Sequence, residues 1–277
     1  MLDDAARPDL LALGAGRLSA IEKVQIALVR RSFEPGLIDK SIRVCQRVIG
    51  STWIHYSTRN LVRVHGLERL PELDPNRSFI CVANHRSFFD LYVVTSLLVR
   101  CGLPHRILFP VRAEFFYTNP LGLFVNAVMS FLAMYPPLFR GRRRAALNLA
   151  SLDELIYLVR RGGVFVGIHP EGTRKRDGDP YTFLPAQRGV GRLIARTRAC
   201  VLPVFIHGLL NDLPRQVRSN FDGTGKRVHV VFGEPVDFGD LFEAPESPRL
   251  HQALADRCLE SIGALGREER RLREEDP

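Results

Sequence analysis

His85 and Asp90, a histidine and an aspartate five residues apart, are the residues whose types and spacing could do chemistry. An apolar run over residues 79–83 precedes them and is short and β-rich enough to predict a buried strand. Residues 91–99 are again apolar and predict a mostly buried helix. His85 therefore ends the strand and Asp90 begins the helix. Because ligands of open α/β sheets bind beyond the carboxyl ends of strands, we expect this pair at a ligand-binding edge.

A carboxylate at Asp90 can bond to one imidazole nitrogen of His85, which fixes the tautomer and leaves the other nitrogen as a base. This base needs no serine or cysteine nucleophile if the substrate itself brings the hydroxyl. The alternative is structural, with a histidine near a helix start and Asp90 as the helix cap. A metal site is a third interpretation, but no second cluster of His, Asp or Glu stands at ligand spacing, and no metal is predicted.

A second block follows the same design. Residues 164–169 predict another buried strand, and residues 170–174 read Pro-Glu-Gly-Thr-Arg. An N-H-x4-D block over residues 84–90, followed about eighty residues later by P-E-G-T-R, resembles the glycerolipid acyltransferase family, the PlsC-like lysophosphatidic acid acyltransferases. The resemblance covers residues 60–240.

The resemblance implies an O-acyltransferase. A fatty acyl group would move from acyl-CoA or acyl carrier protein, as co-substrate, to the free glycerol hydroxyl of a lysophospholipid, first of all lysophosphatidic acid. No cofactor is implied. His85 would be the general base and Asp90 its orienting partner. Backbone N–H groups at the start of the helix after His85 are the expected donors to the oxyanion.

The second block is expected to bind the acceptor. Arg174 is the natural partner for a phosphate, with Thr173 and the backbone of Gly172 beside it. Glu171 would orient Arg174 or bond the acceptor, and a loop-stabilising role is the open alternative.

Two further arginines are carried over from the family pattern. Its middle block is an apolar strand ending in an arginine, which corresponds loosely to Arg140, with Arg142 as the alternative. Arg188 stands before a glycine where the family often has lysine, and so keeps the charge.

Composition is that of an ordinary globular protein with a basic surface. The 277 residues are 45% hydrophobic and carry a net charge of +9, and the positive charges are almost all arginine. Arginine suits phosphate contacts and an anionic membrane surface, whereas no nucleic-acid motif is present. The scattered cysteines indicate reduced core residues, and the acidic start of the chain lacks the features of a signal peptide.

Three apolar segments could face either the protein or a membrane. Residues 17–33 predict a helix with Leu18, Ile21, Val24 and Leu28 on one face. Residues 37–56 predict a second, basic amphipathic helix, which would pack on its own domain or lie in a membrane interface. The uncharged residues 115–139 contain prolines, so we expect a buried or membrane-facing helix there rather than a transmembrane span.

The sequence thus predicts an α/β fold, a mixed and largely parallel central sheet flanked by helices, with an N-terminal amphipathic helical pair. Its expected parts are an arm with two helices over 1–58, an acyltransferase domain over 59–265, which a helix over 247–265 completes, and a charged tail over 266–277 that frays. We expect a cytoplasmic protein, peripheral on the inner face of the cell membrane. Acylation of another lysolipid, such as a lyso-ornithine lipid or lysophospholipid, and a non-catalytic peripheral lipid-binding protein remain the alternatives.

Overall fold

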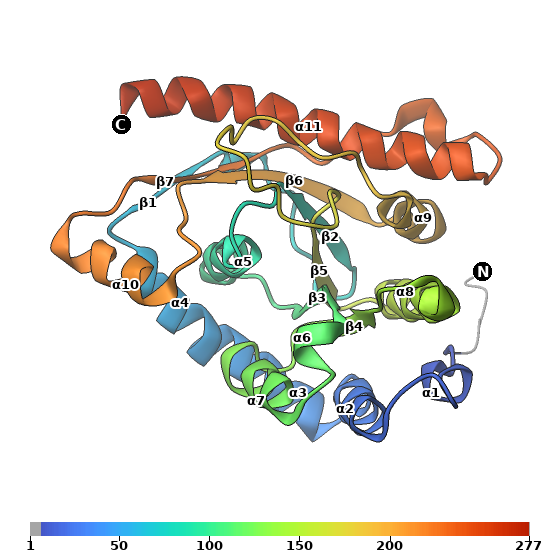
Figure 1. Ribbon diagram of the computed structural model, residues 1–277. Helices are drawn as coiled ribbons and strands as arrows, with labels where there is room; N and C mark the ends of the chain where they lie inside the picture. The colour runs from blue at the N-terminus through green and yellow to red at the C-terminus, as the bar shows by residue number, and fades with distance from the viewer. Residues whose placement is uncertain (1–6, 277) are drawn as a thin grey trace. The chain divides into compact units, whose positions relative to one another are not determined.

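The computed structural model describes residues 7–276, except the side chain of Arg142. Seven strands form a mixed, largely parallel sheet flanked by helices (Figure 1), which confirms the predicted fold class. The chain folds as two compact units. The first contains the described residues through Gly50 with Pro75–Ser78 and Pro104–Val166, and the second contains Ser51–Asp74, Phe79–Leu103 and the rest from Gly167. The predicted division at residues 58 and 265 stays a prediction.

The first unit is mainly helical around three parallel strands. Strand β3 pairs with β4 on one side and with β5 on the other, both in parallel. Its elements in chain order are α1 (Leu10–Leu13), α2 (Ala20–Arg31), α3 (Leu37–Cys45), the π-helix η1 (Gln46–Gly50), β3 (Arg106–Arg112), α6 (Ala113–Phe116), α7 (Pro120–Met129), β4 (Met134–Leu138), the 3₁₀ turn η3 (Arg142–Arg144), α8 (Ala145–Arg161) and the first three residues of β5 (Val164–Ile168).

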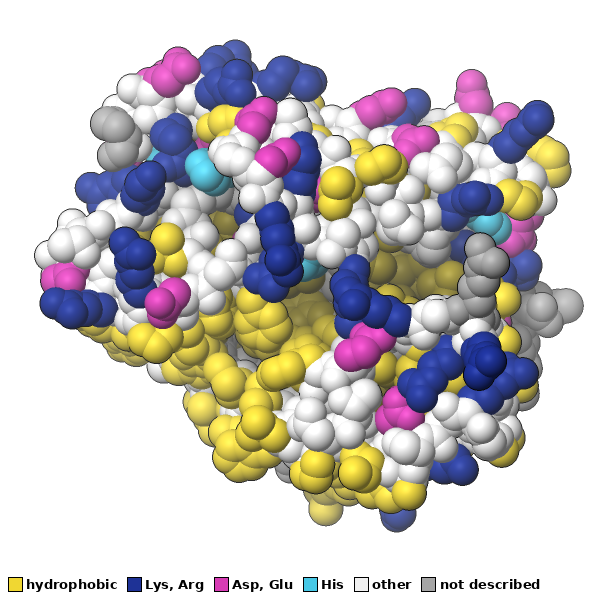
Figure 2. All heavy atoms as spheres, in the orientation of Figure 1, with side chains coloured by type: hydrophobic (Ala, Val, Ile, Leu, Met, Phe, Trp, Pro, Cys, Tyr) yellow, Lys and Arg dark blue, Asp and Glu magenta, His cyan; other side chains and the backbone are white. Residues whose placement is uncertain are grey.

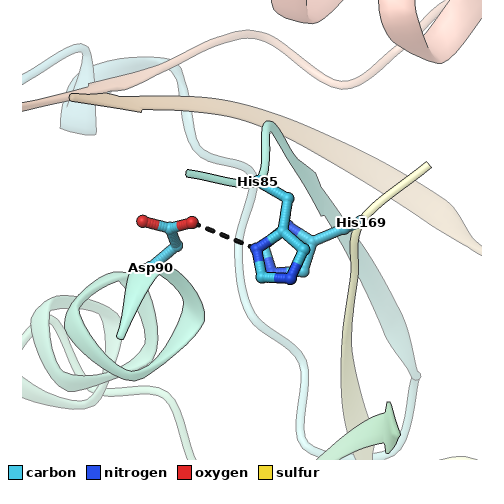
Figure 3. A group of neighbouring side chains, drawn as sticks. All are labelled: His85, Asp90 and His169. Atoms are coloured by element: carbon cyan, nitrogen blue, oxygen red, sulfur yellow. Dashed lines mark hydrogen bonds and ion pairs between the residues drawn. The ribbon is translucent and has the colours of Figure 1, made fainter. Parts of the chain in front are cut away.

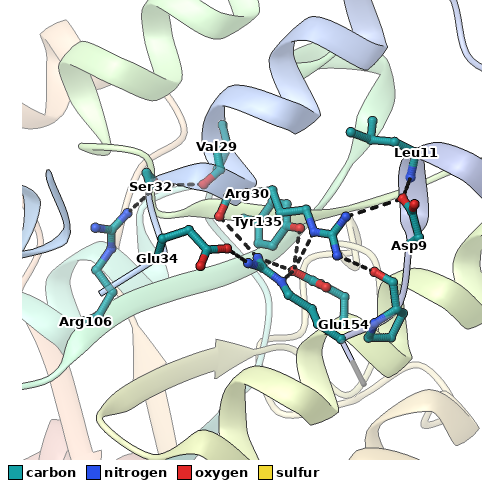
Figure 4. A network of polar contacts seen from close by, with 11 residues as sticks. Asp9, Leu11, Val29, Arg30, Ser32, Glu34, Arg106, Tyr135 and Glu154 are labelled. Carbon is teal, nitrogen blue, oxygen red and sulfur yellow. Dashed lines mark hydrogen bonds and ion pairs between the residues drawn. The ribbon is translucent and has the colours of Figure 1, made fainter. Parts of the chain in front are cut away.

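A buried carboxylate ties the N-terminal helices to this unit (Figure 4). Glu154 of α8 is fully buried and accepts hydrogen bonds from Tyr135 Oη at 2.8 Å and Arg7 Nε at 2.9 Å. Arg30 of α2 lies 3.7 Å away, so two cations compensate one buried anion. Because an unpaired buried charge is costly, this arrangement depends on all of its members.

Helix α2 turns its apolar stripe outward. Ile21, Val24 and Leu28 are 42%, 66% and 51% exposed, whereas the polar Glu22 and Gln25 are buried. These three positions therefore do not pack on the protein, whereas Leu18, the fourth residue of the predicted stripe, is buried. The buried polar pair is held instead by contacts within the unit: Gln25 donates to the carbonyl of Asn119, and Glu22 pairs with Arg144.

The second helix expected over residues 37–56 is not one regular α-helix. A π turn, η1, interrupts it at Gln46, whose side-chain amide accepts from Ile107 N–H and donates to the carbonyls of Ile107 and Phe131. Such wide turns insert one extra residue into a helix, and here the turn aims Gln46 at β3.

The uncharged residues 115–139 also form no single helix. They contain α7, a turn with Phe131 and Leu132 at positive φ, and strand β4. Each helix that the structure describes is too short or too polar to cross a membrane.

The second unit carries four strands in the order β1-β7-β6-β2, with β6 and β7 antiparallel and the other pairs parallel. Its elements are α4 (Ser51–Thr58), β1 (Val62–His65), the 3₁₀ turn η2 (Leu67–Arg69), β2 (Phe79–Ala83), α5 (Asp90–Arg100), the end of β5, α9 (Arg188–Thr197), β6 (Cys200–His207), α10 (Leu213–Asp222), β7 (Val228–Phe232), the 3₁₀ turn η4 (Gly239–Phe242) and α11 (Pro248–Glu275).

Helix α11 lies along β6, β7 and α9 (Figure 1) and buries Leu254, Cys258 and Ile262 against them. Gly191 lets α9 approach closely, because a Cβ there would lie 1.7 Å from the carbonyl oxygen of His251. Every residue of β2 is buried, which fixes the strand that leads into the first motif.

The prediction that the C-terminal tail frays is wrong. Helix α11 does not end near residue 265 but continues to Glu275, because its charged residues find partners in the body of the unit. Glu269 is fully buried and accepts from Tyr181 Oη at 2.8 Å, and Glu268 receives a two-pronged contact from Arg69.

Candidate active site

Asn84 fixes the backbone at the end of β2. Its side-chain amide donates to the carbonyl of Ile206 and accepts from the N–H of the same residue, both at 2.8 Å. The amide thus imitates a backbone strand partner for β6. Asn84 is fully buried, so this pair of hydrogen bonds sets where the next residue, His85, leaves the sheet.

His85 and Asp90 meet as their spacing predicted. Nδ1 of His85 lies 3.3 Å from Oδ2 of Asp90, the first residue of α5 (Figure 3). The side chain of Asp90 is 1% exposed and that of His85 is 19% exposed. An ionised Asp90 accepts the Nδ1 proton, so Nε2 of His85 is left as the basic nitrogen.

The same carboxylate oxygen also accepts the backbone N–H groups of Arg86 and Ser87, both at 2.8 Å. The N–H of Phe88 bonds to Asn211 Oδ1, and that of Phe89 bonds to Ser87 Oγ. The N–H groups of residues 86–89 are therefore engaged within the site, and those of Arg86 and Ser87 hold the Asp90 carboxylate. The expected oxyanion donors, at the start of α5, stay a prediction.

Burial sets the ionisation of the two groups beside His85. Desolvation raises the pKa of Asp90 to about 6, although the two backbone N–H bonds favour its charged form. Desolvation, with the neighbouring His85 as a second cause, lowers the pKa of His169 to about 3. His169 is consequently neutral wherever Asp90 is ionised.

The sequence analysis assigned no role to His169, which follows β5. Its ring stacks on that of His85 with centroids 3.7 Å apart and planes inclined by 8° (Figure 3). Nδ1 of His169 lies 3.0 Å from the carbonyl oxygen of Ala83 and must donate to it. The one signal for it in the sequence was its position directly before the P-E-G-T-R block.

His85, Asp90 and His169 place possible ligand atoms within 4.8 Å of one another, which is close enough to consider a metal ion. The stack argues against chelation, however. Lone pairs of parallel rings point in parallel and do not converge on one ion, and Nδ1 of His169 is committed to Ala83. The donor set suits a base and its supports better than a metal.

Glu171 braces the site from the second motif. It is 1% exposed, and its two oxygens accept from the N–H of His85 at 3.0 Å and of Leu184 at 2.8 Å. Burial raises its pKa. This geometry favours the loop-stabilising alternative over contact with a substrate. Gly172 follows at φ +66°, a conformation that suits glycine, and its N–H bonds to the carbonyl of His169.

Arg174 lies on the same loop as a half-buried side chain, with Nη1 at 2.6 Å from Asn211 Oδ1. Asn211, another residue that sequence reasoning missed, also donates to the carbonyl of Arg86 and so joins both motifs. Thr173 between Gly172 and Arg174 is half-buried, and its hydroxyl has no bonded partner among the described residues.

Two further arginines were predicted to bind the substrates. Arg188 begins α9 with an exposed side chain. Arg140 belongs to the first unit, two residues after β4, where its N–H bonds to Glu114. The side chain of its alternative, Arg142, lies outside the described part of the chain.

The site thus combines a histidine at the end of one strand, an aspartate at the start of the next helix, and a supporting loop after a second strand. The sequence predicted this arrangement for a glycerolipid acyltransferase. The model of the Acyltransferase family matches residues 61–207, more than half of the chain, and the chain belongs to that family.

Among curated relatives, it is 28% identical over 210 residues to the chloroplastic 1-acyl-sn-glycerol-3-phosphate acyltransferase BAT2 of Brassica napus, covering 73% of this chain and 54% of that one. It is 26% identical to the alpha form of 1-acyl-sn-glycerol-3-phosphate acyltransferase of Mus musculus, over 75% of this chain and 64% of that one. The chain thus spans about half to under two thirds of these relatives' length.

A solved structure is similar over nearly the whole chain. The 1-acyl-sn-glycerophosphate (LPA) acyltransferase PlsC from Thermotoga maritima matches with a TM-score of 0.50 at 24% identity, covering 93% of each chain. This likeness shows a shared fold.

Proposed function

We propose that this protein transfers a fatty acyl group from an acyl thioester to the free glycerol hydroxyl of lysophosphatidic acid, forming phosphatidic acid. The observation that carries the proposal is the contact of His85 Nδ1 with the buried Asp90, which keeps the proton on Nδ1 and makes Nε2 the basic nitrogen. The activity named for the two relatives supports the choice of acceptor.

The step begins when Nε2 of His85 takes the proton of the acceptor hydroxyl as its oxygen attacks the thioester carbonyl carbon. Asp90 stabilises the resulting imidazolium. The tetrahedral intermediate collapses with cleavage of the carbon–sulfur bond, and the leaving thiolate takes the proton back from His85. The products are an ester and a free thiol. General-base assistance of this kind contributes roughly 10²–10⁴ in rate.

The oxyanion and the acceptor phosphate need donors other than the engaged N–H groups after His85. For the oxyanion we propose the N–H groups at the start of α5, with the hydroxyl of Thr173, which bonds to no described residue, as a second donor. Arg174 holds the phosphate, because its guanidinium has five donors and Asn211 uses one of them. The Gly172 backbone allows close approach, while Arg188 and Arg140 are further candidates for charged parts of the substrates.

The acceptor is a membrane lipid, so the protein works at a membrane surface, on its cytoplasmic face. Support comes from the first unit, where apolar side chains stand exposed on three helices. Figure 2 shows them gathered along the lower edge, where Figure 1 draws α3 and α7. They include Val24 of α2, Leu37 and Ile38 of α3, and Leu121 and Phe124 of α7. Amphipathic helices of this kind bury their apolar face in the lipid interface.

The test is thiol release with a panel of acceptors: lysophosphatidic acid, lysophosphatidylcholine, a lyso-ornithine lipid and monoacylglycerol. Each is offered with acyl-CoA and with acyl carrier protein. The proposal predicts the highest kcat/KM for lysophosphatidic acid. A clear preference for another lysolipid would reassign the acceptor, and membrane binding without turnover on any acceptor would make the chain a lipid-binding protein.

A further inference from the structure

His169 is a titratable residue whose ring contacts His85, and it has no role in the proposed acyl transfer. It follows β5, whereas His85 follows β2, so two segments 84 positions apart bring their imidazoles face to face. The ring centroids lie 3.7 Å apart and the planes are inclined by only 8°, so the two rings stack face to face.

The base needs such a support. The bond to Asp90 lies at one edge of the His85 ring and is long, at 3.3 Å. A hydrogen bond at one edge restrains the position of Nδ1, but it does not by itself set the plane of the ring against rocking about the line from Nδ1 to Asp90. Rocking moves Nε2, the atom that must meet the acceptor hydroxyl, and small misplacements of a reacting group are costly.

The stack on His169 sets the plane of the His85 ring, and His169 is itself held in place. Its Nδ1 donates to the carbonyl of Ala83, the last residue of β2, at 3.0 Å. The strand that delivers His85 therefore also anchors the ring on which His85 rests. The loop beyond is held by Glu171, which bonds to the N–H of His85.

From this geometry we propose that His169 is a positioning residue, which holds the plane of the His85 ring so that Nε2 faces the acceptor hydroxyl. A neutral ring serves this purpose best, since its π face attracts the imidazolium that forms on His85. The hydrogen bond to Ala83 fixes the tautomer with the proton on Nδ1. The inference rests on the proposed function, because it concerns the same base.

The experiment compares His169→Ala with His169→Phe. The alanine variant removes the stack and should lower kcat roughly 2- to 12-fold, the range that aromatic pairs contribute, with an unchanged KM for the acceptor. The phenylalanine variant restores a flat ring without the Ala83 bond and should recover most of kcat. A purely structural residue would instead change the melting temperature, and the loss of rate would follow unfolding.

Imidazole nitrogen NMR shifts give a readout that needs no turnover. His85 should keep the Nδ1-protonated tautomer in all three proteins, because Asp90 fixes it, whereas exchange between ring orientations should broaden its ring signals only in His169→Ala. An alanine variant with wild-type kcat and a wild-type His85 spectrum would overturn the proposal, as would a folded phenylalanine variant as slow as alanine. If the wild type acylates no acceptor while the spectra change as expected, the proposed function fails and the positioning role stands.

Discussion

Replacing Asp90 with asparagine separates the charge of this residue from its shape. Asp90→Asn keeps an oxygen that can accept the N–H groups of Arg86 and Ser87, so the turn after β2 is preserved. What it removes is the negative charge opposite His85. We therefore expect a variant that folds normally and turns over slowly.

The size of the loss follows from the geometry. A carboxylate and an imidazolium about 4 Å apart attract each other by about 4 kcal/mol at the effective dielectric constant of a protein site. Loss of this attraction in the transition state lowers kcat by about 10³-fold. Acyl-CoA turnover followed by thiol release, at saturating acceptor, measures it directly.

Stability should change in the opposite direction. The pKa of Asp90 is raised from 3.8 to about 6 by burial, so the folded chain holds this proton more tightly than the unfolded chain. The contribution of Asp90 to stability therefore decreases as pH rises from 3.8 to about 6, and the ionised group costs about 3 kcal/mol at neutral pH. Asp90→Asn should melt at the same or a higher temperature at pH 7.

The matched control is Asp237→Asn, an exposed carboxylate between β7 and α11 that caps the N–H of Gly239. It should leave kcat unchanged. An Asp90→Asn variant within about threefold of wild-type kcat would refute the account of the pair. So would a marked fall in melting temperature at pH 7, because the carboxylate would then stabilise the fold.

Three further substitutions test other parts of the structure. Arg174→Ala should raise the KM for lysophosphatidic acid roughly 10-fold or more, as expected for lost hydrogen bonds to a charged group, while steady-state kinetics with monoacylglycerol stay unchanged; equal effects on both acceptors would remove Arg174 from the phosphate. Glu154→Gln should lower the free energy of unfolding by roughly 3 kcal/mol in urea titrations, since it removes the buried carboxylate that Arg7 and Arg30 share and leaves them only the exposed partners Glu34 and Asp9 (Figure 4), and an unchanged midpoint would contradict the network. Phe124→Ser should weaken flotation with anionic liposomes, whereas Phe221→Ser, equally 62% exposed but in the second unit, should not; equal behaviour would dismiss the membrane face.

The sheet and the main pair could be predicted because their signals are local. Residues 79–83 and 164–168 are apolar runs that end in polar motifs, and the structure makes them β2 and β5. Five residues between His85 and Asp90 suffice to cross one turn onto a helix, so the contact follows from chain geometry.

The supporting contacts could not be predicted, because they join distant positions. The amide of Asn84 meets Ile206 across 122 residues, and the carboxylate of Glu171 reaches the N–H of His85 across 86. The stack of His169 on His85 depends on the same tertiary arrangement. Nor does the spacing of Asp90 reveal that its carboxylate also binds the N–H groups of Arg86 and Ser87.

The orientation of α2 shows a second limit of pattern reading. An apolar stripe normally marks the face that packs on the protein, yet Ile21, Val24 and Leu28 are exposed and Gln25 is buried. Hydrophobic periodicity identifies the helix but not its partner, because a lipid surface and a protein core select the same residues.

The most direct test of the central claim is acyl transfer to lysophosphatidic acid by the wild type and by His85→Ala, measured as thiol release with circular dichroism as the control for folding. The account predicts turnover by the wild type and a loss of at least roughly 10²-fold in a folded variant. A folded His85→Ala protein that keeps its turnover would contradict it.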